Sequence, residues 1–509
     1  MSDTGWQRLG DDLYCYPDAC NVYLLRYGDR AIAVDYGTGV WRERLGEIGV
    51  RRLEHVVLTH GHRDQCCGLY RGTPGAGGAR PQLHVPSGDA WLLRGPSLRT
   101  FWRDYQSGGC PSTYAAPRLP VGRLRPDMTP DAEIPIGPAL FCPVATPGHT
   151  RGALSYVVEW HRRQLVFCGD AVRAGGAIHE LYHLEWDHWT PGGAREAWYG
   201  LERLLGCRAD ALLPSHGPPI PKGASSCIRT AQRNLLRLIE AKTSVCSGER
   251  VRWLRPGRTA SGAHRITPHL FGIGGNGYLL LNEAGRALVF DPTMGDMPAL
   301  DAFVEETGVD IVTATATHYH VDHSDALDLV RQRYGAQVWL HPWVAEPLAD
   351  RDRFDLPWLP PDSVTPDRLL PEQGSFRWEG MAMTILPFPG QTWWHCAIHA
   401  HVDGRDILFA GDNYHPPTRW NGTGGFCAFN ASRFAEGFAR SAAAALNLTP
   451  EIVCAGHRSN YRFAASQFRR ILRWSSRAEQ AVAALCPSRS WLDDYDPRRY
   501  RLEPFVTRL

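Results

Sequence analysis

Short apolar runs alternate with glycine and aspartate along two long sections of the chain, and each section ends in one amphipathic pattern. The runs at 55–59 and 311–315 are rich in Val, Ile and Thr, which predicts β-strands. Apolar residues at helical spacing predict helices at about 224–244 and about 464–485. The pattern therefore predicts two strand-rich halves of similar design, each closed by a helix.

The two halves align with each other along most of their length. Asn21 begins the sequence Asn-Val-Tyr-Leu-Leu, and Asn276 begins the corresponding sequence Asn-Gly-Tyr-Leu-Leu. A repeat at about half of the 509 residues indicates duplication of a whole domain. We therefore predict one domain at 1–246, a linker without periodicity at 247–263, and a second domain with a C-terminal tail at 264–509. Duplication also leads us to expect that the two domains pack as an intramolecular pseudo-dimer.

A histidine cluster follows each of the two predicted strands. Residues 59–65 read Thr-His-Gly-His-Arg-Asp-Gln, and residues 317–323 read Thr-His-Tyr-His-Val-Asp-His. Two imidazoles separated by one residue at a strand end can converge on one cation, and a carboxylate two residues further can reach a neighbouring cation. The clusters therefore indicate metal binding.

Further ligand types follow each cluster in the same order. The candidate ligands are His60, His62, Asp64, His149, Asp170 and His216 in the first half, and His318, His320, Asp322, His323, Asp412 and His457 in the second. In the first half, the three imidazoles before Asp170 would hold one ion with an open coordination position. Asp170 could bridge to a second ion held by Asp64 and His216.

The ordered motifs resemble those of the metallo-β-lactamase fold superfamily over both halves of the chain. The resemblance implies an α/β fold, the αββα sandwich, in two tandem copies with one or two Zn²⁺ ions at one edge of each. It implies a metal-dependent hydrolase in which metal-bound hydroxide attacks an ester, thioester, lactone, amide or phosphoester of a small molecule. In that reading Asp64 or Asp322 orients the nucleophile and accepts its proton. Asp35 and Asp291, at matching strand ends, would support the ligand histidines.

Each half departs from the superfamily pattern at one position. Gln65 stands where the pattern has a histidine for the second ion, and Gln391 stands where it has the third histidine of the first ion. Either glutamine could ligate through its amide oxygen, and His395 keeps the strand parity needed to substitute for Gln391. We therefore expect a mononuclear site in the first half and a dinuclear site in the second.

Polar and aromatic residues near the second set of ligands indicate a substrate pocket. The candidates for substrate binding are Tyr319, Tyr414, Arg419 and Arg458. The two arginines favour a small anionic substrate.

The composition restricts the partners and the compartment. A net charge of +2 without a basic stripe gives no electrostatic case for nucleic acid or an anionic membrane. No apolar run approaches the ~18 residues that span a bilayer, and the first residues lack a signal-peptide pattern. The 14 scattered cysteines are typical of reduced thiols, so we expect a cytoplasmic protein.

Two other functions are compatible with the same residues. Histidine and carboxylate ligands without cysteine also suit iron, so the second half could hold a diiron centre that activates oxygen, as in a loosely similar diiron β-hydroxylase of this fold. Alternatively, the two domains could form a metal-stabilised scaffold without catalysis. Iron content and oxygen uptake distinguish the first alternative from hydrolysis, and stability loss without any turnover identifies the second.

Overall fold

The computed structural model describes residues 5–69, 80–94, 124–179, 192–244, 251–350, 358–360, 362–414 and 435–487. By its internal contacts the chain divides into two compact units. Unit 1 comprises Met1–Asp187, Pro191–Glu240 and Ala481–Leu509, and unit 2 comprises His188–Thr190 and Ala241–Gln480.

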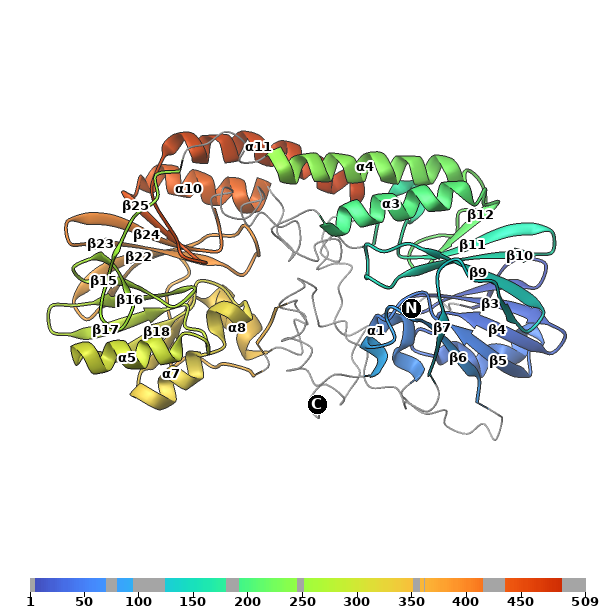
Figure 1. Ribbon diagram of the computed structural model, residues 1–509, viewed down its shortest axis with the longest axis horizontal. Helices are drawn as coiled ribbons and strands as arrows, with labels where there is room; N and C mark the ends of the chain where they lie inside the picture. Colours follow the sequence, from blue (N-terminus) through green and yellow to red (C-terminus); the bar gives the residue numbers. More distant parts are fainter. Residues whose placement is uncertain are drawn as a thin grey trace. The chain divides into compact units, whose positions relative to one another are not determined.

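Unit 1 contains two β-sheets that enclose an apolar core. In the described residues the first sheet has seven strands in chain order, β1 (Gln7–Gly10), β2 (Leu13–Pro17), β3 (Asn21–Tyr27), β4 (Arg30–Val34), β5 (Arg52–Val57), β6 (Gln82–Pro86) and β7 (Leu124–Met128). The second sheet has five strands in the order β12 (Ala211–Pro214), β11 (Arg163–Gly169), β10 (Leu154–Trp160), β9 (Ala139–Ala145) and β8 (Ile134–Ile136). Helices α3 (Gly192–Gly206) and α4 (Ala224–Ser244) cover the outer face of the second sheet (Figure 1). The short helices are η1 (Val40–Ile48), α1 (Arg63–Cys66), η2 (Cys67–Leu69), η3 (Leu92–Arg94) and η5 (Ala174–Gly176).

Side chains of the first sheet alternate between two cores, because successive residues of a strand point to opposite faces. Tyr23 of β3 packs between the two sheets together with Tyr156 of β10. Its neighbour Leu24 packs on the other face, where Trp41 of η1 is also buried. The candidate ligands lie in the loops that follow β5 of the first sheet and β9, β11 and β12 of the second sheet.

Unit 2 repeats this architecture. In the described residues its first sheet has eight strands in chain order, β13 (Gly257–Arg258), β14 (His264–Thr267), β15 (Leu270–Ile273), β16 (Gly277–Leu281), β17 (Arg286–Phe290), β18 (Asp310–Thr315), β19 (Gln337–Leu340) and β20 (Arg368–Leu369). The second has six, β21 (Gly374–Trp378), β22 (Met381–Pro387), β23 (Cys396–Val402), β24 (Arg405–Gly411), β25 (Ile452–Ala455) and β26 (Ser459–Arg462). Helices α5 (Met297–Thr307) and α7 (Leu327–Tyr334) cover the first sheet, and α10 (Arg440–Leu448) and α11 (Ala465–Leu485) lie on the second (Figure 1). The shorter helices are α6 (Val321–Ser324), α8 (Pro342–Ala349) and η8 (Ala435–Ala439).

The predicted helices and strands are confirmed, and the predicted αββα architecture is present in both units. The helices expected at about 224–244 and 464–485 are α4 and α11, and the strands expected before the histidine clusters are β5 and β18. No helix in the described part of the chain is long and apolar enough to cross a membrane.

The contact-defined units assign several segments differently from the predicted domain bounds, including the predicted linker and the end of α11. The described part of the predicted linker contains β13, which pairs with β14 inside unit 2. The end of α11 belongs to unit 1, where Asn234 Nδ2 donates a hydrogen bond to the carbonyl oxygen of Ala484 at 3.0 Å. Sequence periodicity does not reveal the first contact, because β13 has only two residues. It does not reveal the second, because Asn234 and Ala484 are far apart in the chain.

Candidate metal centres

A buried aspartate anchors the histidine loop in each unit. Asp35 follows β4 and accepts a hydrogen bond from Thr59 N at 2.8 Å. Asp291 follows β17 and accepts the corresponding bond from Thr317 N at 2.6 Å. Both aspartates have left-handed backbones, with φ of 61° and 49°, and burial raises the pKa of Asp35 to about 7. Each aspartate thus fixes the residue that directly precedes the first candidate ligand.

In unit 1, three histidines from two loops face one another. The ring centroids of His60, His62 and His149 lie 4.5 to 4.7 Å apart, and His62 Nδ1 lies 2.9 Å from His149 Nε2. The Thr59 hydroxyl lies 3.0 Å from His60 Nδ1, which leaves His60 Nε2 to face the group. Burial lowers the pKa of His62 to about 4, so this imidazole is neutral at neutral pH and offers a lone pair to a cation.

A second group lies beside these histidines and consists of Asp64, Asp170 and His216. His216 Nδ1 lies 2.8 Å from Asp170 Oδ1, and His216 Nε2 lies 3.3 Å from Asp64 Oδ2. Burial acts to lower the pKa of His216, but the two carboxylates raise it well above its ordinary value. A proton on His216 therefore competes with a metal ion for this group. Asp170 Oδ2 also lies 3.2 Å from His149 Nε2, so Asp170 contacts both groups.

In unit 2, Asp412 is common to both candidate groups. It joins His318 and His320 in one group, and Asp322, His323 and His457 in the other. His323 Nε2 lies 3.0 Å from Asp412 Oδ1, and His457 Nε2 lies 3.3 Å from Asp412 Oδ2. Burial lowers the pKa of His320 to about 4. The pKa of His323 is instead raised, because Asp412 and Asp322 outweigh the effect of burial.

Several buried polar atoms in these groups have no hydrogen-bond partner among the described residues. They are His60 Nε2, Asp170 Oδ2 and both amide atoms of Gln65 in unit 1, and His318 Nε2 and Gln391 Oε1 in unit 2. His60 Nε2 and Asp170 Oδ2 lie 3.7 Å apart. A buried polar atom without a partner destabilises a protein unless an ion or water satisfies it. The donor sets therefore fit bound metal ions.

The second groups of the two units differ in ways that extend to their neighbours. His323 of unit 2 corresponds to Gln65 of unit 1, and Gly456 corresponds to Ser215. A Cβ added at Gly456 would lie 2.8 Å from His323 Cε1, so the imidazole occupies space that only glycine leaves open. In unit 1 the Ser215 hydroxyl uses this position to donate a hydrogen bond to Asp35 Oδ2 at 2.7 Å.

Gln391 takes the position of the third histidine beside the shared carboxylate. Its Nε2 donates a hydrogen bond to Asp412 Oδ2 at 3.1 Å. The ring of His395 stacks on His318 at a centroid distance of 4.8 Å, but in the described part of the chain His395 joins neither candidate group. A Cβ added at Gly411 would lie 2.6 Å from His395 Nε2, so this ring packs against the end of β24. Both ring nitrogens of His395 are buried without a hydrogen-bond partner among the described residues, so His395 and Gln391 both stay possible ligands.

Two residues predicted to bind substrate are buried in the protein core. Tyr319 is 0% exposed and packs against Trp394 with ring centroids 6.1 Å apart. Tyr414 is 1% exposed, and its hydroxyl donates a hydrogen bond to the carbonyl oxygen of Phe438 at 2.5 Å. Tyr319 lies between two candidate ligand histidines, and its ring contacts that of His320 at a centroid distance of 4.8 Å. Neither side chain is exposed in the structure, so substrate binding by these tyrosines stays a prediction.

Arg458 and Arg419 were also predicted to bind substrate, and the structure describes only the first of them. Arg458 is exposed and follows the ligand His457 directly. Its Nε donates a hydrogen bond to the carbonyl oxygen of Gly274 at 2.7 Å. Arg419 lies outside the described residues.

Sequence reasoning missed two residues at the unit 1 site. The ring of His179 stacks on His216 at a centroid distance of 3.5 Å and an interplanar angle of 3°. Asp89 accepts hydrogen bonds from Gly61 N at 2.9 Å and from the Thr150 hydroxyl at 2.6 Å. Asp89 thereby ties the loop of the first two histidines to the loop that carries the third. No sequence motif marks either residue, because each reaches the site only through tertiary packing.

The sequence matches the profile of the Metallo-beta-lactamase superfamily in two segments, residues 15–216 and 271–457. The segments cover more than half of the 509 residues and contain all twelve candidate ligands. The chain therefore belongs to this superfamily and carries two tandem copies of its domain.

Curated relatives match shorter stretches. The chain is 28% identical over 140 residues to the hydroxyacylglutathione hydrolase GloC of Haemophilus influenzae, which covers 26% of this chain and 64% of that protein. It is 31% identical over 135 residues to a hydroxyacylglutathione hydrolase of Albidiferax ferrireducens, which covers 26% of this chain and 45% of that protein. The chain thus spans about half to two thirds of the length of these relatives.

Solved structures of the superfamily match part of the chain. A metallo-beta-lactamase family protein of Thermus thermophilus is 21% identical, with a TM-score of 0.37, and the match covers 47% of this chain and 85% of that one. A beta-lactamase domain protein of Burkholderia ambifaria is 17% identical, with a TM-score of 0.37, and covers 51% and 79%. These similarities concern the fold alone.

Proposed function

We propose that the protein is a metal-dependent hydrolase of small-molecule esters or thioesters, with unit 2 as its main catalytic centre. The observation that carries this proposal is the position of Asp412, which belongs to both ligand groups of unit 2. A carboxylate shared by two adjacent groups is suited to a pair of ions that act together on one substrate. Membership of the superfamily and the hydrolases among the curated relatives support the same reaction class.

We propose Zn²⁺ as the resident ion, because imidazole nitrogens and carboxylate oxygens around an open position suit catalytic zinc. In unit 1, His60, His62 and His149 would hold one ion, since Gln65 weakens the second group. In unit 2, the groups around Asp412 would hold two ions. A bound zinc ion supplies Lewis acidity, which lowers the pKa of water and polarises an acyl oxygen.

The two aspartates of the histidine clusters are placed to orient water and to accept its proton. Burial acts to raise the pKa of Asp322 and Asp64, but the neighbouring histidines lower both below the ordinary value, so both are carboxylates. The Asp322 side chain is 36% exposed, whereas that of Asp64 is 8% exposed. A carboxylate in contact with solvent can pass its proton on to water. This difference favours unit 2 as the catalytic unit.

The names of the curated relatives indicate the substrate class to test first. Hydroxyacylglutathione hydrolases act on thioesters of hydroxy acids, and we propose such thioesters as the first candidate substrates. A panel should also include a neutral aryl ester, a lactone and a phosphodiester, so that the reaction class does not depend on the relatives.

Metal content per chain is the first test, measured by elemental analysis of the purified protein and of His62→Ala and His320→Ala. Exposed histidines outside the groups, His161 in unit 1 and His401 in unit 2, provide matched controls as alanine variants. We expect roughly three zinc ions per chain, with a loss in each ligand variant and none in the controls. The absence of metal after zinc supplementation would rule out the proposal.

Hydrolysis and oxygen uptake are then measured on the same samples. We expect thioester or ester hydrolysis that falls with His320→Ala more than with His62→Ala. Two irons lost with His320→Ala, together with oxygen uptake, would instead identify the oxygen-activating alternative. Metal-dependent stability without any turnover would identify the scaffold.

A further inference from the structure

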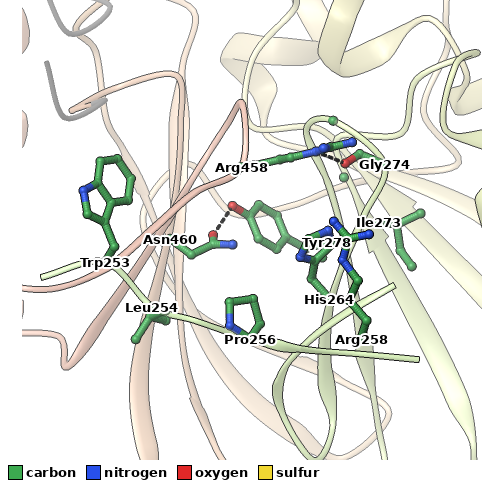
Figure 2. Close-up of a pocket in the computed structure, with 13 residues that line it drawn as sticks. Trp253, Leu254, Pro256, Arg258, His264, Ile273, Gly274, Tyr278, Arg458 and Asn460 are labelled. Carbon is green, nitrogen blue, oxygen red and sulfur yellow. Dashed lines mark hydrogen bonds between the residues drawn. The ribbon is translucent and has the colours of Figure 1, made fainter. Parts of the chain in front are cut away.

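A cavity of ≈ 470 Å³ lies in unit 2 beside the residues that follow its last metal ligand (Figure 2). Three basic side chains line it, Arg258, His264 and Arg458, together with the aromatic Trp253. No Asp or Glu is among the described residues that line it. A cavity of this size accommodates a small molecule, and its lining carries an excess of positive charge.

The cavity is built by one row of residues across four strands. In the register of the first sheet, Arg258 of β13 pairs with His264, which pairs with Gly272 of β15, which pairs with Tyr278 of β16. Residues paired directly across a sheet point to the same face. Because Gly272 has no side chain, the row is open at its centre, with the two basic groups on one side and the tyrosine on the other.

The corresponding row in unit 1 is closed and lacks this charge. There Gln7 pairs with Cys15, which pairs with Tyr23. Cys15 stands in the place of Gly272 and is 1% exposed, so its side chain fills the position that is open in unit 2. Gln7 replaces His264, and β13 has no counterpart among the described strands of unit 1. The cavity is therefore a feature of unit 2 that duplication of the fold does not explain.

Arg458 reaches the cavity through an unusual backbone conformation. Its φ is 58°, and it directly follows His457, whose φ is 53°. Unit 1 has Gly217 at the corresponding position, with a φ of 81°. Glycine adopts this region without strain, whereas other residues are disfavoured there. Retention of an arginine here is consistent with a function for its side chain, which lines the cavity (Figure 2).

We propose that this cavity binds the carboxylate or phosphate group of a small molecule, held by Arg258, His264 and Arg458. The assignment of this molecule as the substrate rests on the proposed function, whereas the binding of the anion does not. Guanidinium groups form strong charge-assisted hydrogen bonds to both kinds of oxyanion.

Two further observations support the proposal. Burial and then the charges of Arg258 and Arg458 lower the pKa of His264, which indicates a positive potential that an anion would relieve. The wall of the cavity also connects to the metal ligands through Asn276, which lies between two lining glycines. Asn276 Nδ2 donates to the carbonyl oxygen of Asp322 at 2.7 Å, and its Oδ1 accepts from His457 N at 2.7 Å. A bound anion is thereby placed next to the loop that orients two ligands.

The test is equilibrium dialysis of the full-length, metal-loaded protein against radiolabelled inorganic phosphate and, separately, acetate. Arg258→Ala removes one charge, and Gly272→Val fills the cavity without removing charge. The Gly272 backbone is not left-handed, and an added Cβ meets nothing nearer than 3.6 Å, so valine fits the strand. Arg255→Ala is the matched control, because Arg255 is exposed on the same segment and does not line the cavity. Phosphate bound to metal ions contributes equally to all variants and cancels in the comparison.

We expect both Arg258→Ala and Gly272→Val to weaken anion binding by about tenfold, and Arg255→Ala to bind like the wild type. Tighter binding of phosphate or of acetate identifies which group the ligand carries. Equal binding by wild type and Arg258→Ala, or no saturable binding to the wild type, would overturn the proposal. If the variants follow the expected pattern while no ester of the panel is hydrolysed, the cavity stands and the proposed hydrolase function fails.

Discussion

The two metal sites share one frame but depart from the complete ligand set at different positions. Unit 1 keeps three histidines in its first group and has Gln65 where the second group would have an imidazole. Unit 2 keeps all four members of its second group and has Gln391 where the first group would have its third histidine. The two sites thus depart from the complete ligand set in different groups.

The comparison also shows that a ligand changes together with the space around it. His323 needs the room left by Gly456, whereas Gln65 is accompanied by Ser215. The identity of one small residue after β12 or β25 thereby determines whether a histidine fits at the second group. A ligand substitution alone would leave a steric conflict or an unsatisfied carboxylate.

The largest effect is expected from removal of the shared carboxylate in each unit. Asp412→Ala deletes a member of both groups of unit 2 and should lower hydrolysis at least about 100-fold, since even indirect supporting residues account for about 10–100-fold. Asp170→Ala should lower it much less if unit 2 is the catalytic unit. Steady-state kinetics of the two variants measure this difference. A larger loss of hydrolysis in Asp170→Ala than in Asp412→Ala would assign catalysis to unit 1.

The second-largest effect is expected on the metal affinity of unit 2, where Gly456 leaves room for His323. Gly456→Ser should weaken metal binding by unit 2 by about tenfold or more, because the added Cβ would lie 2.3 Å from Asp412 Oδ1. Gly456 does not have a left-handed φ, so backbone strain does not contribute. Competition with a zinc-binding dye measures the affinity.

The converse change supplies the control for this experiment. Gln65→His combined with Ser215→Gly should allow unit 1 to bind roughly one additional ion, whereas Gln65→His alone should not. If the single variant gains the ion as readily as the double variant, the steric explanation is wrong.

The smallest effect is a pH dependence of stability from His264, which unit 1 replaces with Gln7. Burial and the two arginines lower the pKa of His264 below its ordinary value of 6.5. As the pH falls through 6.5, the unfolded state takes up the proton first, so this histidine reduces stability as the pH falls from about 7 to about 5. His264→Gln should remove this loss, which solvent screening limits to about 1 kcal/mol. Urea unfolding at several pH values measures it, and a wild type that gains stability relative to the variant at low pH would contradict the assignment.

The repeat, the predicted strands and helices and the order of the ligands follow from the sequence because they depend on local pattern. β5 and β18 end just before the histidine clusters, and α4 and α11 coincide with the apolar periodicity. An ion held by residues at strand ends requires few residue types at nearly fixed spacing, so the candidate ligands were visible without a structure.

Only the tertiary structure decided the roles of the residues around the ligands. Tyr319 and Tyr414 resemble pocket residues in sequence, yet both side chains are buried in the structure. The His395 ring packs against Gly411, and Gln391 donates a hydrogen bond to Asp412. Each of these outcomes depends on contacts between residues far apart in the chain, which local pattern does not contain.

The cavity in unit 2 illustrates the same limit. The sequence by itself placed Arg458 next to a ligand, but the alignment of Arg258, His264 and Gly272 in one row depends on the register of three strands. A shift of one residue would turn these side chains to the other face. The sequence therefore determined the fold, the repeat and the ligand types, whereas the packing of strands decided which side chains face the ions, the core or the cavity.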